Sequence, residues 1–513
     1  MEGNHISKEF GDRTNRFART FLGKPKTQEI SEEFSKFSVG ITGDHDILET
    51  HSGQTILVTL VNLMARFHPT VIVNGLQGIP TKVWLPFGYH TSLNDSVLNI
   101  GAKLSSTVVL KPVDDVDILV SVGPTDNRAS YKIYVNAEGW NAYFSNNVLL
   151  VGFLSQNQNP IGGLLASCFG AADVFRKLLE LLGSHDRRIL RQPKSFVFSA
   201  LDYSTNNKAP NPALPNKVNV GELTIVGGGA VANSLLYAIG MISGVEGSVN
   251  VVDYDSYDST NMNRCLAVCK EHIGIPKAQA LSSLPYTFLH VKPFIGKYAD
   301  FAECRRALDI VVSTVDNNDA RLQIQCDLPR ILFHGATGEN VCTIFKCDFL
   351  EGACLGCLFF EERESRSLTI ARQTGLTLEE VETLLGNNLP LTQAQIERIV
   401  SKTGVKRLQN FVGRTLEELY TQEICGVMQL DMEGQEIAGT VSFVSAIPGI
   451  LLAGEIIKAK IPEFRKFSIN NYLTMNAFYP IARWLLKREK DIRCRCFCSD
   501  PAMRNSFRKK WQL

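Results

Sequence analysis

Fifteen residues from Val251 to Cys265, VVDYDSYDSTNMNRC, place three aspartates, two asparagines and one arginine directly after an apolar run. A glycine turn, GGGAVA, precedes this stretch, and a lysine follows it in GIPKAQA. Small residues let a backbone approach a phosphate, and the start of a helix favours the negative charge of that phosphate. Acids and cations grouped after such a turn indicate a site for a highly charged ligand, such as a nucleotide.

The glycine turn fits the pattern G-x-G-x-x-A with Gly227, Gly229 and Ala232. The next expected strand ends at Asp253, at about the spacing at which an acid meets a ribose hydroxyl in dinucleotide-binding folds. A dehydrogenase would show both features and would need little more after them. Here Asp253 instead opens a longer pattern, D-x-D-x-x-x-x-x-N-x-N-R.

Three further residues complete the constellation, namely Lys277 and then Asp316 and Asn317 in DIVVSTVDNNDAR. In order and spacing it resembles the adenylation domain shared by ubiquitin-type E1 enzymes and the bacterial activators ThiF and MoeB. The resemblance covers about residues 215–500. Three positions depart from the family pattern, in which glycine, serine and glutamine are usual: Ala232, Thr260 and Cys265.

The chemistry of this family explains the residue types. Joining a carboxylate to the α-phosphate of ATP brings two anions together, so cations must neutralise the developing charge while a metal holds the departing pyrophosphate. The resemblance therefore implies ATP and Mg²⁺ as cofactors. It also implies that Asp253 binds the ribose, that Arg264 and Lys277 contact the phosphates, and that Asp316 holds Mg²⁺. The remaining matched positions would shape or support the pocket: Gly227, Gly229, Asp255, Asn261, Asn263, Asn317 and Arg321.

Family members also supply an arginine from a facing copy of the fold, in a segment like R-Y-S-R-Q-L. Here RFARTFL matches that segment and places the role on Arg19, with Arg16 as the second choice. An arginine brought to a phosphate from another domain stabilises charge in many phosphoryl-transfer sites. The alternative is that these arginines belong to an exposed basic helix.

A cysteine that accepts the activated acyl group comes next in the resemblance. In the family it lies shortly before a glycine-containing helix, and the matching residue is Cys425 in EICGVMQLDMEGQEIAGTVSF. A thiolate attacks an acyl adenylate readily and leaves a transferable thioester. The alternative is a buried core cysteine between Ile424 and Val427.

Two cysteine clusters near the end of the chain are typical of a metal site. CLGC has the spacing of a zinc knuckle, and CRCFC offers three more thiols. Two thiolates from each cluster would make a tetrahedral structural Zn²⁺ site. The ligands would be four of Cys354, Cys357, Cys494, Cys496 and Cys498, and the alternative is a set of free thiols.

Three uses of this fold compete. An E1 adenylates the C-terminal glycine of a ubiquitin-like protein, captures it as a thioester and transfers it to an E2. A MoeB- or ThiF-like sulfur-carrier activator stops at the adenylate, and a peptide-modifying adenylyltransferase needs no acceptor cysteine. A catalytically silent scaffold is the non-enzymatic alternative. Without a terminal ubiquitin-fold domain, the chain looks like the E1-like BilD type of bacterial antiphage operons. We therefore expect a ubiquitin-like protein and an E2 as partners.

The elements that must position these residues follow a strand and helix alternation. ELTIV, SLLYAIGMI and SVNVVD form a βαβ unit around the glycine turn, and DIVVSTV and RILFHGAT add strands. KFSVGI, GQTILVTLVNLMARF, PTVIVNG and DDVDILVSV repeat this order earlier, and NPIGGLLASCFGAADVFRKLLE is similar to EIAGTVSFVSAIPGILLAGEIIK. We expect an α/β fold of two Rossmann-like, doubly wound domains, of which the first is degenerate.

Four segments are expected on this basis. Residues 1–195 would form the degenerate adenylation domain with its arginine-bearing helix, and 215–358 the nucleotide-binding part of the active one. Helical signals with threonine N-caps indicate an insertion, which with the catalytic-cysteine segment covers 359–430. Residues 431–513 would complete the active domain with the zinc knuckle and a basic tail. Two copies in one chain predict a monomeric pseudo-dimer.

The composition limits the number of domains, the kinds of partner and the compartment expected for the chain. The 513 residues suffice for two or three domains, and the net charge of +1 argues against a broad electrostatic footprint for nucleic acid or an anionic membrane. The N-terminus lacks an apolar signal core, and no uninterrupted apolar stretch reaches the ~20 residues of a membrane helix. Thirteen cysteines, none before Cys168, favour metal binding or catalysis in a reducing cytoplasm over disulfides.

Overall fold

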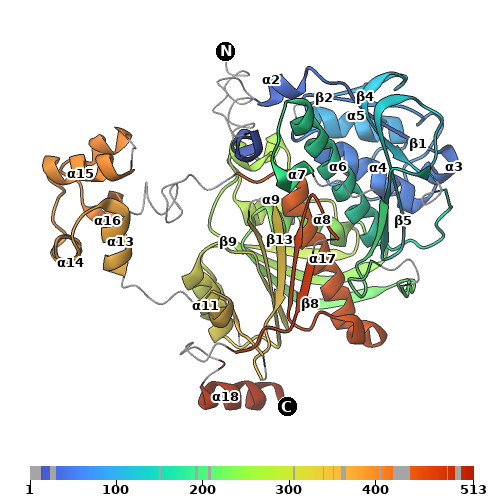
Figure 1. Ribbon diagram of the computed structural model, residues 1–513. Coiled ribbons are helices and arrows are strands. Elements are labelled where there is room, and N and C mark those ends of the chain that lie inside the picture. The colour runs from blue at the N-terminus through green and yellow to red at the C-terminus, as the bar shows by residue number, and fades with distance from the viewer. Residues whose placement is uncertain are drawn as a thin grey trace. The chain divides into compact units, whose positions relative to one another are not determined.

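The computed structural model divides the chain into two units (Figure 1). Unit 1 comprises residues 1–357 and 439–513, and unit 2 comprises residues 358–438. The structure describes residues 13–22, 30–104, 106–148, 152–190, 195–205, 209–303, 305, 307–338, 340–350, 352–359, 366–403, 406–419, 439–481, 483–490, 498 and 500–513.

The first half of unit 1 is built on a seven-stranded sheet. In spatial order its strands are β3 (Thr107–Leu110), β2 (Thr70–Val73), β1 (Val39–Gly43), β4 (Val116–Val122), β5 (Ala129–Glu138), β6 (Asn141–Ser145) and β7 (Ser195–Ser199). The first five strands are parallel, and β6 and β7 continue the sheet in antiparallel pairing. Its helices are α2 (Ile30–Phe34), α3 (His45–Leu48), α4 (His51–Met64), α5 (Leu93–Leu104), α6 (Ile161–Leu181) and α7 (Arg187–Leu190).

The second half repeats this topology in an eight-stranded sheet. Its strands are β10 (Leu289–Ile295), β9 (Val245–Asp253), β8 (Val218–Val226), β11 (Ile310–Ser313), β12 (Ile331–Gly338), β13 (Val341–Lys346), β14 (Tyr472–Asn476) and β15 (Arg483–Leu486). Again the first five are parallel and the rest antiparallel. Its helices are α8 (Ala230–Gly240), α9 (Lys277–Ser282), α10 (Tyr298–Glu303), α11 (Asn318–Cys326), α12 (Leu355–Leu358), α17 (Ser442–Lys460) and α18 (Pro501–Trp511).

The two sheets have the same strand order, reading third, second, first, fourth, fifth, sixth and seventh in each copy. The predicted duplication into two doubly wound domains is therefore confirmed. Central strands such as β4 and β11 are buried along almost their whole length, as parallel strands covered on both faces must be.

Four helices join the two copies into one core. α4 and α6 of the first copy pack on each other, α17 and α8 of the second do the same, and α17 also packs on α6. All four carry long buried apolar runs. α17 is long and apolar enough to cross a membrane by length and composition, but 94% of its most apolar window is buried within the structure, as in the core helix of a globular protein.

Unit 2 is helical and has a core of its own (orange in Figure 1). It contains α13 (Arg366–Thr374), α14 (Leu378–Gly386), α15 (Gln393–Thr403) and α16 (Leu416–Leu419). Thr377, Thr392 and Thr415 each accept a backbone N–H from the residue three positions on, and that residue's side chain accepts the threonine N–H in return. The predicted threonine N-caps are thus confirmed.

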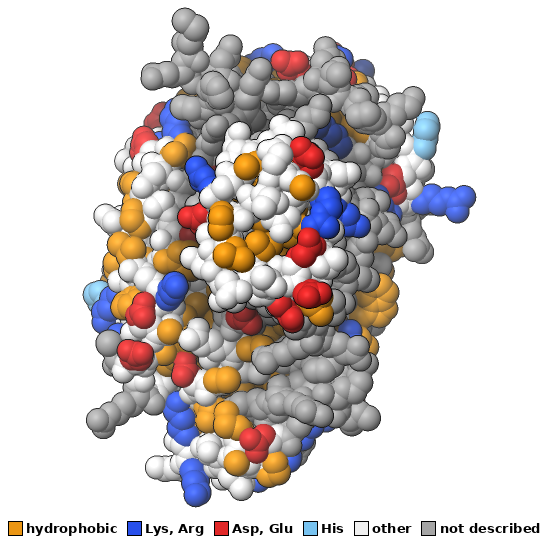
Figure 2. Space-filling model, turned by 90° about the vertical axis from the view of Figure 1, so that its left-hand side faces the viewer, with side chains coloured by type: hydrophobic (Ala, Val, Ile, Leu, Met, Phe, Trp, Pro, Cys, Tyr) orange, Lys and Arg blue, Asp and Glu red, His pale blue; other side chains and the backbone are white. Residues whose placement is uncertain are grey.

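Charged side chains are mixed on the surface. On the face shown in Figure 2, the described lysines and arginines are interspersed with aspartates and glutamates. This mixture agrees with the near-zero net charge of the chain.

Candidate functional site

The candidate site lies where the strand order of the second sheet reverses. From β8 the chain moves outward to β9 and β10 and then returns to the other side of β8 with β11. Open α/β sheets bind ligands in the crevice beyond the carboxyl ends of the strands at such a point. Here β8 leads into Gly227, β9 ends at Asp253, and β11 leads toward Asp316, so the sheet brings three predicted segments to one edge.

The glycine turn after β8 is tightly packed at its start and open at its end. Gly227 has a φ of +95°, and the hydroxyl of Thr314 donates to its carbonyl over 2.8 Å. Gly229 is the N-cap of α8, where no side chain caps the helix. A Cβ placed on Gly229 would meet no described atom within 4 Å. Free backbone N–H groups facing open space at a helix N-terminus suit a phosphate.

Gly228, between the two predicted glycines, is the most constrained of the three. Its N–H donates to Asp253, and a Cβ here would come within 2.8 Å of the Cβ of Lys277. Its carbonyl accepts from the Tyr257 hydroxyl over 2.6 Å and from the Asn233 amide over 3.1 Å. Sequence reasoning missed Gly228, Tyr257 and Asn233. The run of three glycines and a lone amide in an otherwise apolar helix were the available signals.

Asp253 and Lys277 face each other beneath this turn. Asp253 is 9% exposed, and its carboxylate accepts the backbone N–H groups of Gly228 and Asp255. Burial raises the pKa of Asp253, against the opposing charge of Lys277. Burial alone would lower the pKa of Lys277, but the charge of Asp253 and a 2.9 Å hydrogen bond to Asp255 outweigh it, so the pKa is raised and the side chain stays cationic.

The segment from Asp258 to Arg264 forms a short turn held by its own side chains. Asp258 caps the turn and accepts the amide of Asn261 over 2.8 Å. Arg264 donates to the carbonyl of Thr260 over 2.6 Å and to the side chain of Asn263 over 3.0 Å. Burial lowers the pKa of Arg264 to about 10, opposed by Cys265 and assisted by the nearby Arg13. Arg264 therefore lies in the site as a largely desolvated cation.

Asn263 ties this turn to two distant parts of the chain. Its amide donates to the carbonyl of Thr440 over 2.8 Å and to the hydroxyl of Thr14 over 3.2 Å. Thr14 belongs to a helix over residues 13–22, which is anchored by the buried Phe17 and Phe21. A Cβ on Gly439 would collide with the carbonyl of Arg13, so the segment entering α17 lies directly on this helix.

The N-terminal helix thus reaches the site through its first turn. Arg13 is the arginine whose charge acts on Arg264. Arg19, the residue predicted from the sequence, is exposed and lies six residues further along, or about 9 Å of helix. Arg16 is partly buried and lies between them. The role assigned to Arg19 or Arg16 stays a prediction, and Arg13 is a candidate that sequence reasoning missed although it stands in the same R-x-x-R spacing.

The buried thiol of Cys265 has several positively charged side chains around it. Cys265 is 1% exposed, and burial raises its pKa while the charges of Arg264, Arg66, Lys277 and Arg13 all lower it. Four positive side chains therefore lie within electrostatic range of Cys265, and three of them flank the glycine turn and the Asp253 loop. Such a group can neutralise a polyphosphate.

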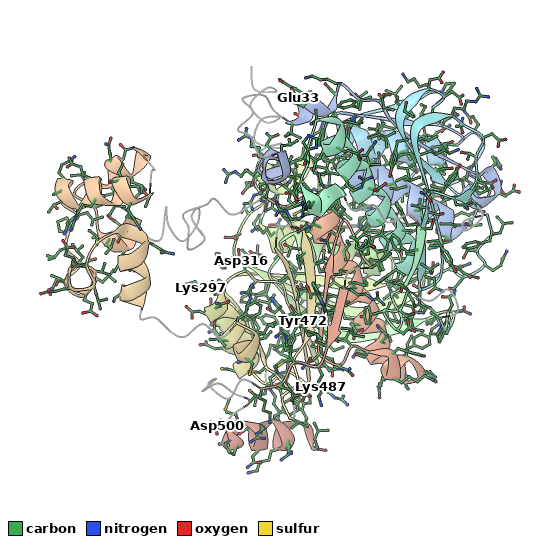
Figure 3. The ribbon with its side chains drawn as sticks, viewed as in Figure 1. Glu33, Lys297, Asp316, Tyr472, Lys487 and Asp500 are labelled. Carbon is green, nitrogen blue, oxygen red and sulfur yellow. The ribbon has the colours of Figure 1, made fainter. Side chains whose placement is uncertain are left out.

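Asp316 lies beyond β11 on the other side of the switch point (Figure 3). It is exposed, and its charge contributes to raising the pKa of Tyr254, after burial and the charges of Asp255 and Asp253. Asn317 caps α11 by accepting the N–H of Ala320 over 2.8 Å. Arg321, 9% exposed, donates to Asn318 over 2.6 Å. Asp316 is thus free of the capping role and available as an oxygen ligand, whereas Asn317 and Arg321 shape its loop.

The corresponding position in the first copy is filled. After β1 the chain forms α3 instead of a glycine turn, and Leu48 lies so close to Gly43 that a Cβ there would come within 2.8 Å of it. Ile47 likewise packs on Gly123, beyond β4. Both side chains are buried. Apolar atoms occupy the space that remains open beside Gly229 in the second copy, which is the physical basis of the predicted degeneracy.

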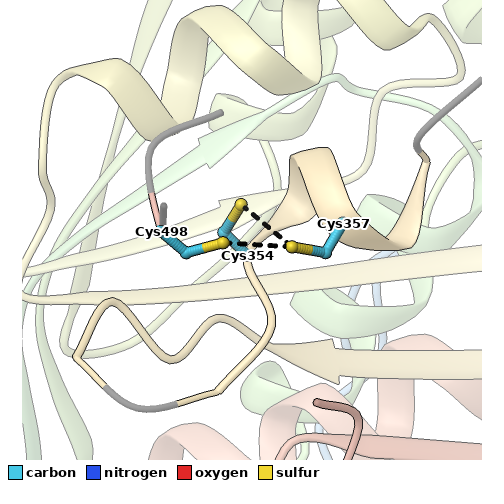
Figure 4. Close-up of side chains that lie close together, drawn as sticks. All are labelled: Cys354, Cys357 and Cys498. Carbon is cyan, nitrogen blue, oxygen red and sulfur yellow. Dashed lines mark hydrogen bonds between the residues drawn. The ribbon is translucent and has the colours of Figure 1, made fainter. Parts of the chain in front are cut away.

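Three of the five candidate metal ligands come together. The sulfur atoms of Cys354, Cys357 and Cys498 lie within 4.8 Å of one another (Figure 4). The Cys357 and Cys498 sulfurs are 3.1 Å apart, and those of Cys354 and Cys357 are 3.9 Å apart. The hydrogen bonds that the Cys354 thiol makes with Cys357, to which it donates, and with Cys498 raise its pKa, and burial raises it further, because these favour the neutral thiol. The donor set fits a thiolate metal site; Cys494, Cys496 and the predicted acceptor Cys425 lie outside the described residues.

Family models and known proteins match parts of this chain. The BilD N-terminal domain matches residues 38–189. Protein y4jF of Sinorhizobium fredii, which is uncharacterized, is 28% identical over 98% of this chain and 96% of its own length. Crystal structures of E. coli MccB, one with AMPCPP and MccA and one with ATP, align with TM-scores of 0.34 and 0.33 at 11% identity.

These MccB alignments cover 54% of this chain and 66% of the MccB chain, just under two thirds. The model of the ThiF family matches residues 216–496, more than half of the 513 residues, and this range contains the glycine turn, the Asp253 loop, Lys277 and Asp316. The chain belongs to the ThiF family, whose adenylyltransferase-like fold it shares, and carries a BilD N-terminal domain in front of it.

Proposed function

We propose that this protein is an E1-like activating enzyme, which uses ATP and Mg²⁺ to adenylate the C-terminal glycine of a ubiquitin-like protein. The observation that carries the proposal is the contrast between the two copies. The second copy keeps an open helix N-terminus at Gly229 with cations around it, whereas Ile47 and Leu48 fill the equivalent space in the first. One ATP site per chain follows from this contrast.

The residues of the site divide the work of adenylation among them. The N–H groups after Gly228 and the start of α8 would hold phosphate oxygens, and Asp253 would hold the ribose. A glycine carboxylate oxygen attacks the α-phosphorus, the bond to the bridging oxygen breaks, and pyrophosphate leaves with its electron pair. Lys277 and Arg264 offset the charge that builds up on the phosphates. Asp316 would hold Mg²⁺, which supplies positive charge to the departing pyrophosphate.

We further propose a structural Zn²⁺ held by Cys354, Cys357, Cys498 and one of Cys494 and Cys496. The three described thiols already lie at mutual distances that one ion could bridge. A closed set of four thiolates would leave no position for a substrate, so this metal would stabilise the fold and take no part in adenylation. It would fasten the segment before α18 to the segment after β13.

The later steps of the proposal concern Cys425 and an E2. A thiolate at Cys425 would attack the carbonyl of the acyl adenylate, release AMP and form a thioester, which an E2 cysteine would then take over. Thr440, whose carbonyl accepts a hydrogen bond from Asn263 beside Arg264, lies fifteen residues after Cys425 in the sequence (440 − 425). We place this activity in bacterial antiviral defence in the cytoplasm, as the resemblance to the BilD type implies; the match of the BilD N-terminal domain supports that resemblance.

The experiment combines the protein, ATP–Mg²⁺ and ubiquitin-like proteins ending in glycine, and measures ATP–pyrophosphate exchange alongside gels with and without reductant. Wild type should show exchange and a reductant-sensitive adduct. Cys425→Ala should keep the exchange and lose the adduct, while Cys326→Ala, at an exposed cysteine, should keep both.

The outcomes separate the competing functions. If both wild type and Cys425→Ala show ATP–pyrophosphate exchange and neither forms an adduct, the protein is a sulfur-carrier activator and not an E1. An adduct that survives in Cys425→Ala would assign the acceptor role to another cysteine. Absence of both ATP binding and exchange with every acceptor would leave a scaffold and refute the proposal.

A further inference from the structure

Arg66 is a fully buried cation in the first copy whose hydrogen bonds lead into the second. It lies just after α4 and is 1% exposed. Its guanidinium donates to the carbonyl of Leu266 over 3.1 Å, to the carbonyl of Val268 over 3.0 Å, and to that of Met262. Three backbone acceptors of one loop are thus satisfied by a single side chain from the opposite domain.

Asn62 completes this contact from one helical turn earlier. Its carbonyl oxygen accepts from Nε of Arg66 over 2.9 Å, which fixes the plane of the guanidinium. Its amide donates to the carbonyl of Leu266 over 3.0 Å. Asn62 is itself 1% exposed. The planar fork of arginine is suited to several acceptors held in fixed directions, and a lysine could not bond all of them at once.

The loop that Arg66 holds is the one that carries Arg264. Met262 and Leu266 stand on either side of Arg264 in the chain, and both of their carbonyls point to the same guanidinium. No regular strand or long helix spans residues 262–268, so these carbonyls have no ladder to satisfy them within the described structure. The position of Arg264 in the nucleotide site therefore depends on a residue in the degenerate copy.

The cation is retained at a cost that a purely apolar interface would avoid. Burial lowers the pKa of Arg66 to about 10, opposed by Cys265, Cys269 and Tyr237. Among the described residues no carboxylate forms an ion pair with Arg66, whose hydrogen-bond acceptors are carbonyl and amide oxygens. Within the described structure the hydrogen bonds of its guanidinium go to three backbone carbonyls and one side-chain amide oxygen, so the contact is specific in direction.

We propose that Arg66, oriented by Asn62, is a positioning residue for adenylation, which sets the place of Arg264 in the nucleotide site of the other copy. This inference rests on the proposed function, since it assumes that ATP binds at that site. It assigns the degenerate copy a defined part in the reaction and explains why a domain with a filled nucleotide position is kept in the chain.

The test compares Arg66→Lys and Asn62→Ala with a matched control, Thr59→Val. Thr59 lies on the same helix, is buried, and bonds the Tyr237 hydroxyl of α8 over 3.1 Å, so its loss weakens the same interface without removing a hydrogen bond to the loop. Two quantities are measured on the full-length protein: the Kd for ATP–Mg²⁺ and the rate at which iodoacetamide labels Cys265 relative to the fully buried Cys168, followed by peptide mass spectrometry.

Arg66→Lys and Asn62→Ala should each weaken ATP binding about tenfold and raise the labelling ratio of Cys265 to Cys168 by a similar factor. Thr59→Val should change neither the affinity for ATP nor the labelling ratio, even if its melting temperature falls as far as those of the other two variants. Should Arg66→Lys not fold, Asn62→Ala still decides. ATP affinity within twofold of wild type in the folded variants, or an equal loss in Thr59→Val, overturns the inference. A wild type that binds no ATP overturns the proposed function itself, independently of the labelling ratios.

Discussion

Asp253 performs two structural tasks in addition to the ribose contact proposed for it. One carboxylate oxygen accepts the N–H of Gly228 and the other that of Asp255, so the same group shapes the glycine turn and its own loop. The short D-x-D spacing lets Asp255 turn back to Lys277. The family pattern in the sequence therefore predicted which residues gather here, while their mutual hydrogen bonds depend on backbone direction and could not be read from spacing.

At Asp316 we expect a metal-dependent loss. Asp316→Ala should reduce ATP–pyrophosphate exchange by about 100-fold or more. Without this carboxylate the site would lose a ligand of Mg²⁺, and the metal would no longer offset the charge on the leaving pyrophosphate. Asp319→Ala is the matched control, since Asp319 is an exposed carboxylate in the first turn of α11. The assay is exchange at saturating ATP over a range of Mg²⁺ concentrations. Equal rates in the two variants would remove Asp316 from the site.

Three variants determine which arginine of the N-terminal helix acts in the nucleotide site. Arg13→Ala should slow exchange at least ~10-fold, because its charge lies beside Arg264, whereas Arg19→Ala should act as wild type. Arg16→Ala tests the arginine that lies between these two in the helix. Exchange rates and melting temperatures are measured together for all three. If only Arg19→Ala is slow, the original prediction from RFARTFL is right and the placement of Arg13 is incidental.

Among the elements, the glycine turn shows most clearly how one segment is fixed by several others. The turn directly follows β8. Thr314, after β11, donates to the first carbonyl of the turn, and Tyr257 and Asn233 donate to the second. The sequence indicated the turn and the following helix. It did not indicate Tyr257, because an aromatic residue inside an acid-rich loop has no periodic signature, and its partner Gly228 is 29 residues earlier in the chain.

Replacing Gly228 should disturb this element specifically. In Gly228→Ala the new methyl group would meet Lys277 and Asp253, at a cost of about 1–3 kcal/mol of overpacking unless the turn shifts. We expect ATP affinity to fall at least ~10-fold, as measured by calorimetry. Gly338→Ala, at a glycine where a Cβ meets no described atom within 4 Å, is the control. Unchanged affinity in Gly228→Ala would show that the turn adjusts freely and does not position the phosphate site.

At the scale of the whole molecule, the repeated topology was accessible from the sequence because matched strands and helices recur in the same order. The reason why the position corresponding to the glycine turn is filled in the first copy was not. Nothing in the letters around Gly43 reveals that Ile47 and Leu48 fold back over the ends of β1 and β4. Nor could spacing have linked Arg66 to a loop about two hundred residues away, since pairing across an interface leaves no local pattern.

The cysteine cluster joins segments that are far apart in the chain, so its metal should affect global stability. Wild type should contain Zn²⁺, and a strong chelator should lower the melting temperature by several degrees, in line with the few kcal/mol that closing a long loop contributes. Cys354→Ser should reproduce the loss and resist further change by the chelator, whereas Cys326→Ser should behave as wild type. Elemental analysis and thermal denaturation measure both. A metal-free wild type of full stability would exclude the zinc proposal.

On the proposed function, the filled position beside Leu48 and the cross-domain contact of Arg66 together predict the stoichiometry of ATP binding. One polypeptide offers one open nucleotide position, so a titration should saturate at a single equivalent of ATP per chain. Because the partner domain is covalently attached, its effective concentration at the site does not change on dilution. Specific activity should therefore stay constant at protein concentrations where two separate subunits would have parted.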